Sequence, residues 1–243
     1  MTMKITERAI DKLANGMRIY AEAHANFETL RRVDLEEAID DLDRSFEAEL
    51  EAFHSLYDVD KAAFDYFEHA DTALILLLRN AIHHKDHELF SSWNATMAQD
   101  GGPLRFAGAA FLLVSHSVVG DAHVANQLYK AEDFLLRLDP SLGSPALEAK
   151  MKPRNRDKLL QQLKSDLGFD QIFAKAGAEH YPSKQVYLNV IPIFVSAICR
   201  VFKSLRERGA SFNGFDARIY ASHFTDALRV DLSALRYKTI RIE

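Results

Sequence analysis

Cysteine, glycine and proline are scarce in this chain. Cys199 is the only cysteine among 243 residues, which excludes a disulfide within the chain and a zinc site built from several cysteines. The 10 glycines and 6 prolines are fewer than a turn-rich all-β protein of this length would need. Because so few cysteines are typical of proteins in a reducing cytosol, we expect a cytoplasmic protein.

The sequence also lacks a long hydrophobic run. Residues 1–13 carry charge throughout, which is unlike a signal peptide. The longest nearly uncharged run, 106–120, is too short to cross a bilayer and contains Ser115, His116 and Ser117. We therefore expect no membrane partner, and we expect His116 to be a buried core histidine with its polar atoms satisfied.

Charge and common motifs exclude further classes of protein. The formal net charge of −5 does not favour binding of nucleic acid over the whole surface, so any contact with RNA must use a local patch. The chain contains no glycine-rich nucleotide motif, no G-x-S-x-G and no H-E-x-x-H. The sequence therefore indicates no cofactor and no bound metal.

Apolar residues recur at helical spacing along almost the whole chain. Asp34 precedes one such segment and is expected to cap its N-terminus, with Glu37 three residues later. The expected helices cover residues 5–25, 33–57, 60–85, 104–118, 121–138, 157–167 and 184–208. The pattern predicts an all-α fold, a helical bundle with additional C-terminal helices.

A single all-helical domain over 1–243 is the simplest organisation. Proline, glycine and serine collect in 139–156, which we expect to be an exposed loop. That loop would divide the chain into a bundle core at 1–138 and a helical elaboration at 157–243. After Gly209 the pattern leaves strand and helix open, since the last seven residues alternate enough for a terminal strand.

The stretch LLLRNAIHHKDHELF, residues 76–90, places polar groups directly after the most apolar helix. Arg79, Asn80 and His84 form the pattern R-N-x-x-x-H. This pattern at the end of a buried helix resembles the HEPN superfamily of helical proteins, which carry an R-x4-6-H motif in which a polar residue often follows the arginine. The R-x4-6-H spacing also occurs at Arg18 and Arg218, but isoleucine follows each of those arginines.

The resemblance implies a metal-independent endoribonuclease that works as a homodimer. Its products would be a 2′,3′-cyclic phosphate and a 5′-hydroxyl. In this chain Arg79 would neutralise the phosphate oxygens and His84 would transfer the proton, with Asn80 in support. Some toxin-like members have a tyrosine, modified by a partner enzyme, where this chain has Asp86, so that form of control is not expected; an antitoxin or other regulatory partner stays open.

Helix geometry favours a different histidine. Residues five apart lie about 140° apart around a helix, whereas residues four apart nearly superpose. Arg79 therefore shares a helix face with His83 more closely than with His84. The resemblance selects His84 as the proton-transfer residue, and the geometry alone selects His83.

Two alternatives to a ribonuclease compete for the same residues. The polar stretch could be the C-terminal end of a buried helix in a non-catalytic RNA-binding or protein-interaction protein, because basic residues complement the helix dipole there. A metal-binding bundle is the third reading. It would use the E-x-x-H pair Glu51 and His54, which has no second copy, with further ligands from Asp65, His69, His83, Asp86 or His87.

Basic residues collect in two later segments. A flexible basic segment suits a phosphate backbone, so the first is a candidate RNA contact. It contains Lys150, Lys152, Arg154, Arg156 and Lys158. The second lies along the last long helix and contains Arg200, Lys203, Arg206 and Arg208. Each of them could equally be an ordinary solvated surface.

Overall fold

A computed structural model describes residues 4–84, 88–98, 102–119, 125–227 and 229–243. Its helices are α1 (Ile5–Leu30), α2 (Leu35–Asp60), α3 (Ala70–His84), α4 (Trp93–Ala98), α5 (Ala131–Leu138), α6 (Pro153–Ser165), α7 (Phe169–Ala178), α8 (Ile191–Glu207) and α9 (Phe215–Ser222). Its strands are β1 (Ala110–Val119), β2 (Leu128–Lys130), β3 (Val186–Asn189) and β4 (Arg229–Arg241). The prediction of an all-α fold is therefore wrong, because this is a mixed fold of helices and one sheet.

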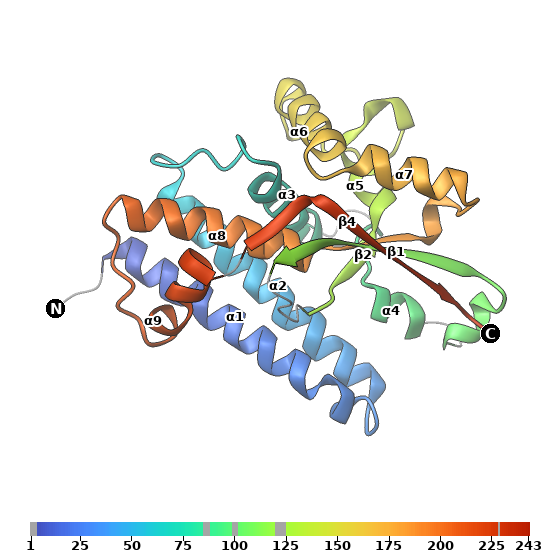
Figure 1. The fold of residues 1–243 in the computed structure, drawn as a ribbon, viewed down its shortest axis with the longest axis horizontal. Helices are drawn as coiled ribbons and strands as arrows, with labels where there is room; N and C mark the ends of the chain where they lie inside the picture. The colour runs from blue at the N-terminus through green and yellow to red at the C-terminus, as the bar shows by residue number, and fades with distance from the viewer. Residues whose placement is uncertain (1–3, 85–87, 99–101, 120–124, 228) are drawn as a thin grey trace.

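The long helices α1 and α2 pack side by side in opposite directions, and α3 and α8 complete this helical part (Figure 1). The expected cap is confirmed, since the Asp34 side chain accepts a hydrogen bond from the Glu37 amide at 3.0 Å. At Gly16 the two backbones approach so closely that an added Cβ would lie 3.3 Å from Glu49 Cα. The small glycine therefore allows α1 and α2 to pack closely at this point.

The sheet has the strand order β2-β3-β1-β4. Strand β1 pairs in parallel with β3 and antiparallel with β4, and β2 pairs antiparallel with β3. The strands that lie before and after 139–156 therefore share one sheet. Its pairings join segments that are far apart in sequence, as the crossing of β1 and β4 in Figure 1 shows.

Three of the expected helices contain strands, and a fourth, 60–85, begins only at Ala70. The segment 104–118 forms mainly strand β1, 121–138 contains β2 before α5, and 184–208 contains β3 before α8. Short apolar runs do not distinguish a buried strand from a buried helix by periodicity. Strand β3 is buried at all four positions, as strands covered on both faces are. Pro192, in the first turn of α8, marked the true start of that helix.

The segment 139–156 is only partly a loop. Arg137 and Glu148 form a buried ion pair of 2.5 Å that holds the segment against α5. Helix α6 begins at Pro153, four residues before the expected start, and proline suits the first turn of a helix. In the tail after Gly209, where the sequence left both options open, α9 is followed by the long strand β4.

The two faces of the sheet pack against different neighbours. Leu112 and Val114 of β1 belong to the main core, which also contains residues of α1, α2, α3 and α8. Phe111 of β1 and Tyr187 of β3 belong to a smaller cluster with Trp93 on the opposite face. Within the described ranges, no helix is long and apolar enough to cross a membrane.

Candidate functional site

Helices α2 and α3 bring together residues of the two motifs found in the sequence. Arg79 Nη2 donates to Glu51 Oε2 at 2.7 Å, and His83 Nδ1 lies 3.1 Å from the other carboxylate oxygen, Oε1. Arg79 Nη1 also donates to Asn80 Oδ1 at 3.1 Å. One carboxylate on α2 thus links the arginine and a histidine that lie four residues apart on α3.

The position of Arg79 follows from how α3 is buried. Each residue from Leu74 to Leu78 is at most 1% exposed, so α3 is surrounded by other elements up to that point. The side chain of Arg79 is 15% exposed and that of His83 is 54% exposed. The helix therefore emerges from the core within these residues, and its polar groups lie at the boundary with solvent.

Arginine is the dominant charge in this group. Burial opposes ionisation of Glu51, but the hydrogen bond from Arg79 and its positive charge outweigh burial and lower the pKa of the carboxyl group. Burial, followed by the charge of Arg79, lowers the pKa of His54, one turn further along α2. Glu51 is thus held as a carboxylate, and the charged form of His54 is disfavoured.

A surface cavity of about 390 Å³ opens beside this ion pair. Its walls come from both helices and include Arg44 and Glu47 of α2 as well as Ile82 of α3. Glu51, Arg79 and His83 also line it. The sequence had suggested Glu51 only as a metal ligand, and Arg44 and Glu47 were not selected, because nothing local to α2 shows which of its faces meets α3.

His84 is the last residue of α3, and its side chain lies outside what the structure describes. Asp86 and His87 also lie outside the described residues. The structure therefore brings Arg79, Asn80 and His83 together and gives no position for the side chain that the resemblance selects.

The E-x-x-H pair does not form a metal-binding group among the residues described. His54 Nδ1 lies 3.3 Å from Asp58 Oδ2, and Glu51 faces Arg79. His69 stacks near Phe64 at the start of α3, with ring centroids 5.6 Å apart. In the described part of the chain, no three histidine, cysteine, aspartate or glutamate side chains are grouped so that they could hold a metal ion.

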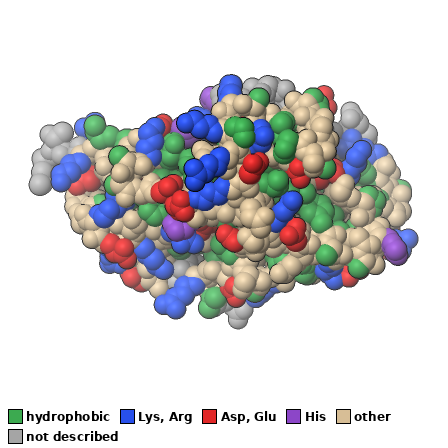
Figure 2. Space-filling model, turned by 90° about the horizontal axis from the view of Figure 1, so that it is seen from above, with side chains coloured by type: hydrophobic (Ala, Val, Ile, Leu, Met, Phe, Trp, Pro, Cys, Tyr) green, Lys and Arg blue, Asp and Glu red, His purple; other side chains and the backbone are tan. Residues whose placement is uncertain are grey.

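The first basic segment lies on and before the start of α6. Lys150, Lys152, Arg154 and Lys158 are exposed and Arg156 is half-buried. Lys158 forms an ion pair with Glu68, just before α3. Residue 79 is eleven positions further along, and at 1.5 Å per helical residue this segment and Arg79 belong to opposite ends of α3. On the face seen in Figure 2, Lys and Arg side chains are interspersed with acidic ones.

The second basic segment is largely neutralised by acidic partners. Arg208 makes two hydrogen bonds of 2.8 Å to Asp60, whose side chain is 4% exposed. Arg200 pairs with the fully buried Asp71. Arg206 pairs with Asp226 at 2.7 Å. These three arginines tie α8 to its neighbours and offer less free charge to RNA than the sequence suggested.

No family model, no curated protein and no solved structure matches this chain significantly.

Proposed function

We propose that this protein is a metal-independent endoribonuclease of HEPN type with its active site at the cavity between α2 and α3. The observation that carries the proposal is the group formed by Arg79 and His83 around Glu51. Arginine can present two parallel donors to phosphate oxygens, and histidine exchanges protons near neutral pH. Both groups line the surface cavity between the two helices.

In this proposal Arg79 neutralises the charge that develops on the phosphate during attack by the adjacent 2′-hydroxyl. One histidine removes the 2′-hydroxyl proton, and an acid protonates the leaving 5′-oxygen, so that the products are a 2′,3′-cyclic phosphate and a 5′-hydroxyl. A neutral His83 that donates through Nδ1 to Glu51 would use Nε2 as the base. His84 is the second candidate, taken from the resemblance, and Asn80 supports Arg79 through its carbonyl oxygen.

The proposal includes RNA as the partner and a homodimer as the working form. Two copies of the motif would then act on one RNA strand. The cations of the first basic segment, of which Arg156 is half-buried, would contact the RNA backbone away from the cleavage point, and this contact would weaken as salt rises. They are Lys150, Lys152, Arg154, Arg156 and Lys158. An antitoxin or other regulator would be a further partner.

A non-catalytic interaction protein is the second candidate, and one observation favours it. In the structure Arg79 already has a carboxylate partner on another helix. Under this second hypothesis, the only role of the ion pair would be to hold α3 against α2. Removing Arg79 would then lower stability without any effect on RNA.

Cleavage of a mixed RNA substrate in the presence of EDTA tests the proposal. The variants are Arg79→Ala, His83→Ala and His84→Ala. The stability of each variant is measured by thermal unfolding, so that loss of activity can be distinguished from loss of the fold. A matched control is present in the chain, because Arg218 and His223 have the R-x4-H spacing and are both exposed on and after α9.

We expect cleavage that survives EDTA, is abolished by Arg79→Ala and by one of the two histidine variants, and is unchanged in Arg218→Ala and His223→Ala. Which histidine variant loses activity assigns the proton-transfer residue. Absence of cleavage by the folded wild-type protein, or equal activity in all variants, would reject the proposal. Cleavage that needs a divalent metal would also reject it.

A further inference from the structure

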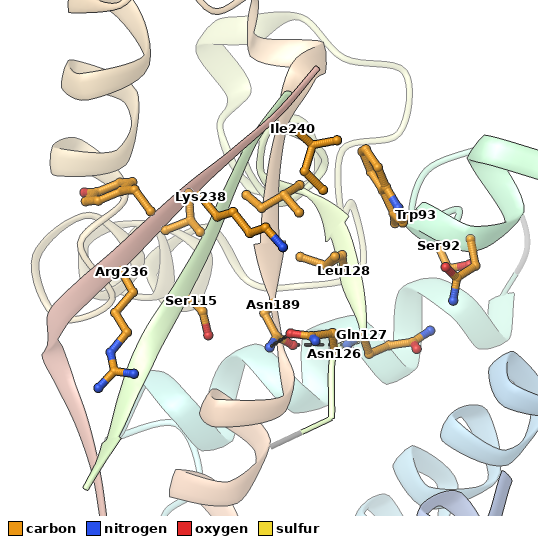
Figure 3. A pocket seen from close by; sticks show the side chains of 14 residues that line it. Ser92, Trp93, Ser115, Asn126, Gln127, Leu128, Asn189, Arg236, Lys238 and Ile240 are labelled. Atoms are coloured by element: carbon orange, nitrogen blue, oxygen red, sulfur yellow. Dashed lines mark hydrogen bonds between the residues drawn. The ribbon is translucent and has the colours of Figure 1, made fainter. Parts of the chain in front are cut away.

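A second cavity lies on the sheet, on the face that carries the smaller cluster. Leu113 and Ser115 of β1 are paired with Lys238 and Arg236 of β4, respectively. Residues directly opposite in an antiparallel pair project from the same face. Side chains from two strands that are far apart in sequence therefore share one surface. Figure 3 shows this surface with α4 at one side.

The cavity has a volume of about 370 Å³, within the range of small-molecule sites. Trp93, at the start of α4, forms one wall. Its ring meets those of Phe111 and Tyr187 edge to face, with centroids 5.1 Å and 4.9 Å away. These contacts fix the indole at the end of the cavity opposite Arg236, as Figure 3 shows. Leu128 and Ile240 add apolar surface between them.

The charged side chains that line this cavity are positive. Among the described residues that line it, Arg236 and Lys238 are charged, and none is a carboxylate. The Lys238 side chain extends over the sheet, with its amine directed toward Leu128 and Asn189 (Figure 3). Arg236 Nε donates to Ser117 Oγ at 3.0 Å. The two cations are two residues apart on one strand, so their Cα atoms lie about 7 Å from each other and their side chains leave the same face of the sheet.

The buried side-chain amides of two residues form the base of this cavity. Asn189 and Gln127 are 2% and 1% exposed. Asn189 Oδ1 accepts from the backbone amide of Gln127, and Gln127 Nε2 donates to Asp43 Oδ1 at 2.8 Å. This orientation leaves Gln127 Oε1 buried without a donor among the residues described. An unsatisfied buried acceptor costs about 1–3 kcal/mol, so this amide is held in place at a cost to stability.

We propose that this cavity binds a mononucleotide. The base would lie beside Trp93 and use the polar floor, and the phosphate would bind Lys238 and Arg236. Aromatic rings suit nucleobases because every base has a π face, and paired cations suit phosphate. This site is separate from the proposed ribonuclease site, since its residues come from the sheet and α4. Helix α2 separates the two, with Asp43 bound to Gln127 and Arg44 lining the other cavity.

Trp93 provides a direct test because it is the only tryptophan in the chain. Its fluorescence in the full-length protein is followed while each of the four ribonucleoside monophosphates is added, and calorimetry supplies the affinity. The matching nucleoside and inorganic phosphate are titrated separately. The variants are Lys238→Gln and Arg236→Gln. Arg241→Gln is the control, because Arg241 is an exposed cation of β4 that does not line the cavity.

We expect at least one nucleotide to change the fluorescence saturably and to bind more tightly than its nucleoside and than phosphate. Loss of either cation should weaken binding about ten- to a hundred-fold, the effect of one charge-assisted hydrogen bond. Arg241→Gln should bind like wild type. No saturable change and no heat with all four nucleotides would overturn the proposal. So would phosphate that binds as tightly as the nucleotide, or an unaltered affinity in Lys238→Gln. These results do not depend on RNA cleavage, so the two proposals fail separately.

Discussion

The guanidinium group of Arg79 lies 2.7 Å from the carboxylate of Glu51, measured from Nη2 to Oε2, across the contact between α3 and α2. The two residues are 28 positions apart in the sequence. Their pairing keeps a positive charge at the edge of the core, where an arginine without a partner would be costly. It also means that a phosphate must compete with Glu51 for Arg79.

Replacing Glu51 with glutamine should tighten RNA binding. The change keeps the size of the side chain and removes the negative charge that competes with phosphate. Because Glu51 is 38% exposed, the pair contributes about 0.5–1 kcal/mol, and we expect about a two- to five-fold gain in affinity with little loss of stability. The measurement is filter binding of RNA, made with and without Glu51→Gln in whichever histidine variant, His83→Ala or His84→Ala, has lost cleavage. Weaker binding would show that Glu51 instead holds Arg79 in its binding position.

Replacing Asp133 with asparagine should stabilise the protein above pH 6. Burial raises the pKa of Asp133 to about 6, while the Phe90 amide, which donates to Oδ2 at 2.8 Å, lowers it less. The folded state therefore binds more protons than the unfolded state between about pH 4 and 6, so stability falls as pH rises through this window. The shift corresponds to about 3 kcal/mol. Urea unfolding of both proteins at pH 4 and pH 7 measures it.

In that comparison the stability of Asp133→Asn relative to wild type should increase from pH 4 to pH 7. Asparagine keeps a carbonyl oxygen that can accept from Phe90, which limits the change to the charge. A difference between the two proteins that stays constant with pH would show that Asp133 does not hold a proton in the folded state.

Replacing His116 with leucine should remove a loss of stability at acid pH. This pH dependence has the opposite sign to that of Asp133. His116 is 2% exposed, as predicted for a core histidine, but it lies on strand β1 and not on a helix. Neither of its buried ring nitrogens has a hydrogen-bond partner among the described residues, so the expectation that its polar atoms are satisfied is wrong. Burial lowers the pKa of His116 to about 4. The unfolded state therefore binds more protons between about pH 6.5 and 4, and stability is lost as pH falls through this window, by about 3 kcal/mol in all. Wild type should lose this amount relative to His116→Leu in urea unfolding between pH 7 and pH 4; parallel curves would contradict the assignment.

Two glycine substitutions should have opposite effects. At Gly16 an added methyl group would lie 3.3 Å from Glu49 Cα, so Gly16→Ala must push α1 and α2 apart and should cost about 1–3 kcal/mol. Gly177, on α7, has open space around it, so Gly177→Ala should stabilise by about 0.5–1 kcal/mol through helix propensity. Thermal unfolding measures both. A neutral Gly16→Ala would mean that a small shift of the two helices and the better helix propensity of alanine together offset the close contact.

Local sequence patterns predicted part of the fold. The expected helices at 5–25 and 33–57 correspond to α1 and α2, and the cap at Asp34 is present. The expected helix 60–85 corresponds to α3, which begins later, at Ala70. These elements follow from hydrophobic spacing and capping, which depend on residues within a few positions of one another.

The sheet could not be predicted in the same way. Strand β1 is stabilised by hydrogen bonds to β3 and β4, and each residue of β1 pairs with one that lies at least 74 positions later in the sequence. An isolated apolar run of this length is compatible with either helix or strand, and only these distant partners decide between them. The cavity beside Trp93 exists for the same reason, because its cations reach it from the last strand.

By itself the sequence determined that Arg79 and His83 share a helix face, because the period of an α-helix is local and fixed. It also determined that this face lies at the end of a thoroughly apolar helix. Only the tertiary structure decided that Glu51 lies opposite both residues, since the face of α2 that meets α3 depends on how α1 and α2 pack. At Gly16 the helix α1 comes close to the backbone of α2 at Glu49, and Glu51, two residues later, projects from nearly the opposite side of α2.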